Sequence, residues 1–154
     1  MELSEKVDFL LRKALAQHQS LGNRELRQVL RLMAKWRSEL LARAIAQRQG
    51  GMVFAGPFAG MRFSPEGHEG SAAAQLLGCY EHELHAVVEK LVAAAPTTIV
   101  NIGCASGYYA VGLALRLPGA EVHAFDIEPA ARANCRETAR LNGVAGRVII
   151  GERF

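Results

Sequence analysis

The second half of the sequence alternates between short apolar, β-branched segments and longer helix-like segments. Strands are predicted at 97–102, 121–126 and 147–150. A helix is predicted at 108–117, where Pro118-Gly119 ends it, and another at 129–143, opened by a proline and closed by a glycine. Strands that alternate with helices pair in parallel through right-handed crossovers. The sequence therefore predicts an α/β fold containing the first three strands of a partial Rossmann-like parallel sheet.

The longest run without Asp, Glu, Lys or Arg extends from Leu91 to Leu115, which is long enough to cross a bilayer. It contains Pro96, Asn101 and several glycines, which would break a spanning helix. We therefore interpret this run as a buried strand, a tight turn and a buried helix, and we expect no membrane span.

The N-terminal third predicts a hairpin of two amphipathic helices. Apolar residues recur at helical spacing before and after a break at 20–23. This third carries ten Lys or Arg against five Asp or Glu, although the whole chain has a net charge of only +3. A basic helix face can bind nucleic acid, but no RNA-binding motif and no interleaved aromatic residues accompany the charge. We expect a solvated face, with nucleic acid an unlikely partner.

Two further segments connect the hairpin to the sheet. Alternating large apolar residues punctuated by Gly and Pro predict a short β-hairpin or lid at 51–70, with its turn near Gly56-Pro57. One helix is then predicted from about Ser71 to Ala95, before Pro96. The expected organisation is a helical hairpin at 1–50, the strand and turn segment at 51–70, and the N-terminal half of a Rossmann-like domain at 71–154.

The turn after the first predicted strand is the segment that most directly indicates function. Gly103 and Gly107 let the backbone adopt conformations that side chains forbid and let a ligand approach the main chain. Asp126 follows nineteen residues after Gly107, at the end of the second strand, where a carboxylate can accept hydrogen bonds from both ribose hydroxyls. The turn and the acid together predict a ligand that carries a nucleoside.

The spacing of the turn bears on which nucleoside is bound. A dinucleotide fingerprint, G-x-G-x-x-G, counted from Gly103 places Ala105 and Tyr108 at its second and third glycines. This register disfavours an NAD(P)-dependent oxidoreductase, which stays as an alternative. A non-enzymatic module whose hairpin mediates dimerisation or contacts nucleic acid is a second alternative.

The segment Asn101-Ile102-Gly103-Cys104-Ala105-Ser106-Gly107 resembles the first motif of class I S-adenosylmethionine-dependent methyltransferases, in the register x-x-G-x-x-x-G. The resemblance extends through Val122-His123-Ala124-Phe125-Asp126-Ile127-Glu128-Pro129, which is similar to that family's second motif. It covers about residues 97–150. Asn101 stands where the family usually has an acidic residue, and Ala105 where glycine is frequent.

The resemblance implies S-adenosylmethionine as the cofactor and a methyl acceptor, which we expect to be a small molecule. Gly103 and Gly107 would border the methionine part, Asp126 would bind the ribose, and Ile127 would lie against the adenine. The remaining cofactor residues implied in the first motif are Asn101, Cys104, Ala105 and Ser106. Methyl transfer mainly requires alignment of an acceptor with an already activated methyl group, so the sequence assigns no catalytic residue.

The region from Gly56-Pro57-Phe58 through Leu76-Leu77-Gly78-Cys79-Tyr80-Glu81 is similar to lead-in segments of some bacterial methyltransferases. That similarity makes Tyr80 and Glu81 candidate residues of the cofactor site. His82 and His85 lack the spacing and partners of a metal site, so no metal is expected. Cys104 has no base beside it in the sequence, and we interpret it as a small packing residue rather than a nucleophile.

Three strands are fewer than the seven of a complete class I methyltransferase. We therefore expect an N-terminal fragment of a longer enzyme, a self-associating chain, or a reduced binding module, and favour the fragment. A homo-oligomer would form through the N-terminal helices or the free sheet edge. The charged N-terminus and the odd number of cysteines predict a cytoplasmic protein.

Overall fold

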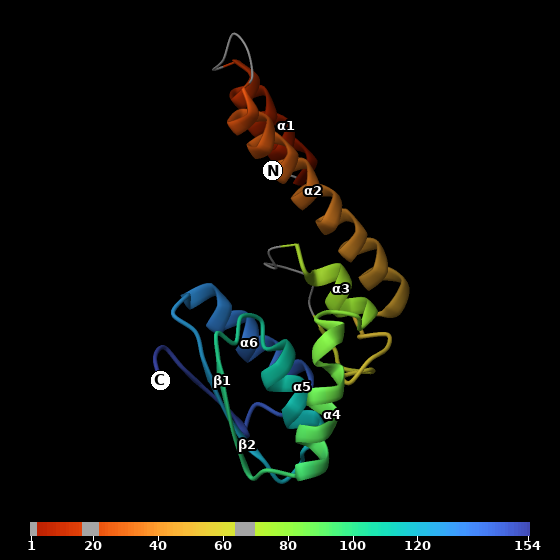
Figure 1. Cartoon of the computed structure of the whole chain (residues 1–154), viewed down its shortest axis with the longest axis vertical. Helices are drawn as coiled ribbons and strands as arrows, with labels where there is room; N and C mark the ends of the chain where they lie inside the picture. The colour runs from red at the N-terminus through yellow and green to blue at the C-terminus, as the bar shows by residue number, and fades with distance from the viewer. Residues whose placement is uncertain (1–2, 17–21, 64–69) are drawn as a thin grey trace.

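The computed structural model describes residues 3–16, 22–63 and 70–154. The chain begins with two helices, α1 (Leu3–Ala16) and α2 (Asn23–Gln49). Figure 1 shows α1 lying along the first part of α2, and the pair projecting away from the rest of the molecule. α2 ends where Gly50 adopts a left-handed conformation, and the far end of α2 packs against α3 (Ala72–Leu77). The expected helical N-terminus is confirmed.

The segment after α2 contributes to the core mainly through its side chains. Its one β-bridge among the described residues joins Met52 to Arg62 in antiparallel orientation, so the expected hairpin is reduced to a single pair. Phe58, Met61 and Phe63 are almost completely buried and belong to the main hydrophobic core. Residues 64–69, which complete this expected element, lie outside the described residues. The segment therefore acts as an apolar cover.

The expected single helix at 71–95 was wrong. The structure instead has α3, a short 3-10 turn η1 (His82–Leu84) and α4 (His85–Ala94). α3 ends because Gly78 has a φ of +79° and packs so tightly on the Ala55 backbone that a Cβ would overlap the Ala55 carbonyl. The interruption moves Tyr80 and Glu81 into the connection between helices, which determines where they point.

The sheet has three parallel strands in the order β1-β2-β3: β1 (Thr98–Ile102), β2 (Glu121–Phe125) and β3 (Val148–Gly151). Helices α5 (Tyr108–Arg116) and α6 (Pro129–Leu141) connect them and cover one face. On that face Val122 and Ala124 are fully buried. The partial Rossmann-like sheet is confirmed, and the paired register of Ile102 with Phe125 brings the carboxyl ends of β1 and β2 together.

The opposite face of the sheet is open. Val100, Ile102 and Ile149 are exposed there. Within the described parts of the chain, no strand pairs with the outer edge of β1. No helix in the described ranges has the length and apolar character needed to span a membrane.

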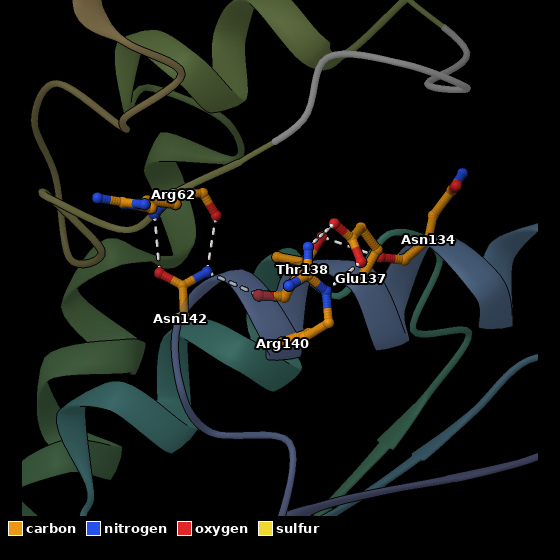
Figure 2. Close-up of polar contacts among 6 residues, drawn as sticks. All are labelled: Arg62, Asn134, Glu137, Thr138, Arg140 and Asn142. Carbon is orange, nitrogen blue, oxygen red and sulfur yellow. Dashed lines mark hydrogen bonds and ion pairs between the residues drawn. The ribbon is translucent and has the colours of Figure 1, made fainter.

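Asn142 joins the segment 51–63 to the Rossmann-like part, as Figure 2 shows. Its Oδ1 accepts a hydrogen bond from the Arg62 amide at 2.8 Å, and its Nδ2 donates to the Arg62 carbonyl at 2.7 Å and to the Thr138 carbonyl at 2.8 Å. The side chain thereby pairs with both backbone groups of a residue 80 positions earlier in the chain. This contact holds the apolar cover beside the end of α6.

Candidate functional site

The bend between β1 and α5 is held against the end of β2 by hydrogen bonds. The amides of Gly103 and Cys104 both donate to the Phe125 carbonyl, at 2.8 and 2.9 Å. The Asp126 Oδ2 accepts from the Ala105 amide at 2.9 Å, and its Oδ1 accepts from the Glu128 amide at 2.9 Å. A carboxylate has about four acceptor positions. The Asp126 carboxylate therefore faces the bend, and these two hydrogen bonds leave acceptor positions for a ligand.

The two glycines of the bend serve different purposes. Both have positive φ, +74° at Gly103 and +87° at Gly107. A Cβ at Gly107 would lie 2.8 Å from the Cys135 sulfur, so this glycine allows α5 to begin close against α6. A Cβ at Gly103 would meet no atom within 4 Å. The space beside Gly103 is open, as required where a ligand approaches the main chain.

Ala105 has a φ of +46°, a left-handed conformation that is uncommon for a residue with a side chain. This conformation explains physically why glycine is favourable at this position of the bend. The strain is compensated locally, because the Ala105 amide donates to Asp126.

A cavity of about 400 Å³ lies at the carboxyl ends of β1 and β2. Its lining includes Gly103, Asp126 and the predicted adenine residue Ile127, which is 70% exposed. Phe125 and Phe154 also line it, with their rings edge to face at 5.5 Å. Exposed apolar groups beside a carboxylate suit a nucleoside, which presents a flat base and a hydroxylated sugar.

A second cavity, of about 240 Å³, lies on the other side of the bend and shares Ile102 and Gly103 with the first. It brings together the predicted residues from both parts of the sequence: Tyr80, Glu81, Asn101, Cys104, Ala105 and Ser106. Gly107 itself is not among the lining residues and follows them directly at the start of α5. Glu81 is fixed by a hydrogen bond from the Tyr109 hydroxyl to its Oε2, at 2.6 Å.

Four polar atoms in the lining of this second cavity are buried and have no hydrogen-bond partner among the described residues. They are Gln75 Oε1, Asn101 Oδ1, Ser106 Oγ and Tyr108 OH. Three of the four side chains belong to residues that are only 3–4% exposed. Burying unpaired polar atoms costs free energy, and native proteins normally pair them. These four unpaired oxygens belong to residues that line one region beside the bend, and Gln75 and Ser106 also line the neighbouring cavity on the α6 side.

Sequence reasoning missed Gln75, Tyr108 and Tyr109. Gln75 is the polar residue of an otherwise apolar α3, Ala-Ala-Ala-Gln-Leu-Leu, and that contrast was an available signal. The two tyrosines directly follow the bend, but nothing in the sequence showed that they pack against Phe58 and Tyr80. Arg132 was also missed: its guanidinium donates to the carbonyls of Asp126 and Ile127 and supports the turn after β2.

The environment of the second cavity changes the acidity of its side chains. Burial raises the pKa of Tyr108 to about 12. Burial and the hydrogen bond to Glu81 raise the pKa of Tyr109 above the ordinary range. A hydrogen bond with Cys135 lowers the pKa of the Cys104 thiol. Both tyrosines are therefore neutral near neutral pH, and the Tyr109 hydroxyl donates to Glu81.

A third cavity, of about 550 Å³, adjoins the second on the α6 side of the bend. The two share Gln75, Tyr80, Ala105 and Ser106, and Asp126 connects the third cavity to the first. The three cavities thus surround the bend. In the described ranges no group of three or more His, Cys, Asp or Glu side chains could hold a metal ion.

The chain has sequence relatives among known methyltransferases. A stretch of 67 residues is 43% identical to release factor glutamine methyltransferase of Moorella thermoacetica. A stretch of 68 residues is 34% identical to the protein of the same name from Deinococcus radiodurans. Each match covers 44% of this chain, and the chain spans about a quarter of the length of these curated relatives.

No family model matches the chain. Among solved structures, an O-methyltransferase family protein from Burkholderia thailandensis is 19% identical with a TM-score of 0.46, over 79% of this chain and 38% of that one. The sequence relatives agree with the resemblance to methyltransferases: the homologues found for this chain are methyltransferases.

Proposed function

We propose that this chain binds S-adenosylmethionine and forms the N-terminal part of a methyltransferase. The observation that carries the proposal is the Asp126 carboxylate, which faces the glycine bend between cavities on both sides of Gly103. Ligands of open α/β sheets bind at the carboxyl ends of the strands, which is where these cavities lie. The methyltransferase relatives support the same reaction class.

The first and second cavities suit chemically different parts of the cofactor. We assign the adenosine to the first cavity, where Asp126 would accept hydrogen bonds from the ribose hydroxyls and Ile127 would contact the adenine. We assign the amino-acid part to the second cavity, where the four unpartnered polar atoms would gain partners. Ile102 and Gly103 line both cavities, so they would lie at the junction of the two parts.

The cofactor supplies a methyl group already activated by a positively charged sulfur. The protein therefore has to hold the cofactor, exclude water and align the acceptor for displacement. In this chain Asp126 and the bend would fix the position of the cofactor.

Two classes of methyl acceptor are compared for this chain, a protein and a small molecule. The names of the relatives give glutamine of a release factor as the acceptor of those proteins. From the sequence we expect a small molecule. Incubation with radiolabelled S-adenosylmethionine and either a release factor or a pool of small metabolites separates the two, because the label is recovered with protein in one case and in the small-molecule fraction in the other.

We also propose a partner for the open sheet and a cellular compartment for the protein. The exposed strand edge and the apolar face with Val100 and Ile102 need cover, and we propose that another polypeptide, such as a second copy, provides it. All three cysteines are free thiols, which suits a reducing compartment such as the cytoplasm. Light scattering of the purified chain tests the first of these: a strictly monomeric chain at high concentration would count against a second copy.

Calorimetric titration of the chain with S-adenosylhomocysteine, NAD and NADP tests the cofactor assignment. We expect saturable binding of S-adenosylhomocysteine and a matching rise in melting temperature, with neither effect for the nicotinamide cofactors. Binding of NAD or NADP in place of S-adenosylhomocysteine would support the oxidoreductase alternative. A folded chain that binds none of the three at millimolar concentration would contradict the proposal.

A further inference from the structure

We infer that Glu81 supplies the negative charge that binds the α-ammonium group of the cofactor's amino-acid part, and that Tyr109 positions Glu81 for this role. The inference rests on the proposed function and extends it to the recognition of one chemical group. It arises from the composition of the second cavity, where Asn101 is neutral.

Glu81 is the one charged side chain in the described lining of the second cavity. An ammonium group that leaves water needs a nearby negative charge, because burying an unpaired charge is costly. Asp126 is not in the lining of this cavity. Within the described cavity the anionic partner is therefore Glu81.

The position of Glu81 is fixed by its neighbours. The Tyr109 hydroxyl donates to Glu81 Oε2 at 2.6 Å, and Tyr109 follows the glycine bend in α5. This donor orients the carboxylate without cancelling its charge, because burial and the same hydrogen bond keep Tyr109 protonated. The Glu81 backbone has a φ of +45°, which few residues with side chains adopt. The hydrogen bond thus ties the carboxylate to the element that begins at the bend.

The unpartnered atoms of the cavity complement an amino acid. Asn101 Oδ1 and Gln75 Oε1 are acceptors, and an ammonium group has three N–H donors. Ser106 and Tyr108 carry hydroxyls that can donate to the α-carboxylate. The Glu81 carboxylate and the amide oxygens would bind the α-ammonium group, and the hydroxyls would bind the α-carboxylate. Together they match the zwitterionic end of the cofactor.

Two ligands that differ in the amino-acid part test this inference. S-adenosylhomocysteine carries that part, whereas 5′-methylthioadenosine keeps the adenosine and the thioether without it. We expect Glu81→Gln to weaken binding of S-adenosylhomocysteine about tenfold or more, as loss of a charged hydrogen-bonded pair does, and to leave 5′-methylthioadenosine unchanged. Tyr109→Phe should weaken S-adenosylhomocysteine less, again without affecting 5′-methylthioadenosine.

Glu83→Gln is the matched control, because Glu83 is an exposed carboxylate two residues further along and is not in the described lining of this cavity. It should change neither affinity. A measurement on the unaltered chain avoids dependence on how the variants fold: S-adenosylhomocysteine without its α-amino group should bind the wild-type chain as weakly as the complete ligand binds Glu81→Gln.

Each other outcome overturns one specific statement. If Glu81→Gln weakens both ligands equally, or neither, Glu81 does not bind the ammonium group. If removal of the α-amino group from the ligand leaves wild-type affinity unchanged, the inference is also wrong. If the wild-type chain binds neither S-adenosylhomocysteine nor 5′-methylthioadenosine, the proposed function itself fails.

Discussion

Asp126 at the end of β2 accepts a hydrogen bond from the Ala105 amide in the bend after β1, with 2.9 Å between the Asp126 Oδ2 and the Ala105 nitrogen. Two residues that are 21 positions apart in the sequence therefore form one structural unit. The same carboxylate also accepts from the Glu128 amide, so it holds both the bend and the turn into α6. Preorganisation of a ligand site by its own backbone contacts lowers the cost of binding.

Replacing Asp126 should therefore affect both stability and ligand binding. In Asp126→Asn, the side-chain NH₂ would face one of the two backbone amide donors, and we expect a loss of about 1–3 kcal/mol of unfolding free energy. We also expect at least a tenfold loss of S-adenosylhomocysteine affinity, measured by calorimetry. Glu137→Gln removes an exposed carboxylate of α6 that pairs with Arg140, so it should leave the affinity unchanged and lower the unfolding free energy far less than Asp126→Asn does. Unchanged affinity in Asp126→Asn would contradict the assigned ribose contact.

Ala105→Gly should stabilise the protein, because Ala105 has a φ of +46°. Relief of left-handed strain of about 1–2 kcal/mol outweighs the greater backbone entropy that glycine has in the unfolded chain, about 0.5–1 kcal/mol. Denaturant titration measures the difference. Ala93→Gly is the control with the opposite sign: Ala93 is an exposed residue of α4, where glycine should cost about 1 kcal/mol. A destabilised Ala105→Gly variant would contradict the observed conformation.

Gly112→Ala should destabilise the protein by about 1–3 kcal/mol through overpacking. A Cβ at Gly112 would overlap the Phe58 ring, which is 3% exposed and packs edge to face on Tyr108 and Tyr109. At Gly119 a Cβ would meet nothing within 4 Å, so Gly119→Ala should stay within about 0.5 kcal/mol of wild type. Equal stability of the two variants, measured by thermal unfolding, would show that the segment 51–63 does not cover α5 as described.

Tyr108→Phe should stabilise the protein without ligand, because it removes a buried hydroxyl that has no partner among the described residues. The expected gain at neutral pH is about 1 kcal/mol. The edge-to-face ring contacts with Phe58, Phe63 and Tyr80 would be kept. If this hydroxyl binds the ligand, the same variant should bind S-adenosylhomocysteine more weakly, so stability and affinity should change in opposite directions.

The pH dependence of this variant follows from the raised pKa of Tyr108, about 12 against an ordinary value of 10. Below pH 10 the residue is protonated in both the folded and the unfolded state. Between pH 10 and 12 the unfolded chain loses this proton while the folded chain keeps it, so stability falls by about 1.4 kcal/mol per pH unit from this residue. Tyr108→Phe should unfold with a shallower alkaline slope than wild type, and an identical slope would contradict the burial of Tyr108.

The regular part of the fold could be predicted from the sequence because its signals are local. β-branched runs gave the strands, and Pro129 marked the start of α6. The prediction of one helix at 71–95 was wrong because a tertiary contact ends the helix at Gly78. This glycine lies against the backbone of Ala55, which is 23 positions earlier. The glycine was visible in the sequence, but its packing partner was not.

The candidate site was predictable to a similar degree. Asp126 and the bend were found because their spacing follows from the strand–turn–helix unit. Gln75 and Tyr109 were missed, because their roles depend on tertiary packing that brings α3 and α5 to the same cavity. No pattern within ten or twenty residues contains that information. The hydrogen bond between Tyr109 and Glu81, which are 28 positions apart, could not be predicted for the same reason.

Asn142→Asp should loosen the attachment of the segment 51–63. Aspartate keeps an acceptor for the Arg62 amide but replaces a group that donates to the carbonyls of Arg62 and Thr138. A carboxylate facing two carbonyl oxygens should cost about 1–3 kcal/mol. Hydrogen exchange should show faster exchange at Val53 and Phe63, whose amides donate within this segment. Unchanged exchange there would mean that the side chain in Figure 2 does not hold the cover.

Backbone amide NMR of the isotope-labelled chain during titration with S-adenosylhomocysteine tests the site most directly. We expect saturable shift changes concentrated at 102–107 and 126–128, with a second group at Glu81 and Tyr109, and much smaller changes in α1 and α2. Saturable changes confined to α1 and α2, or a spectrum unchanged at millimolar ligand, would contradict binding at the glycine bend.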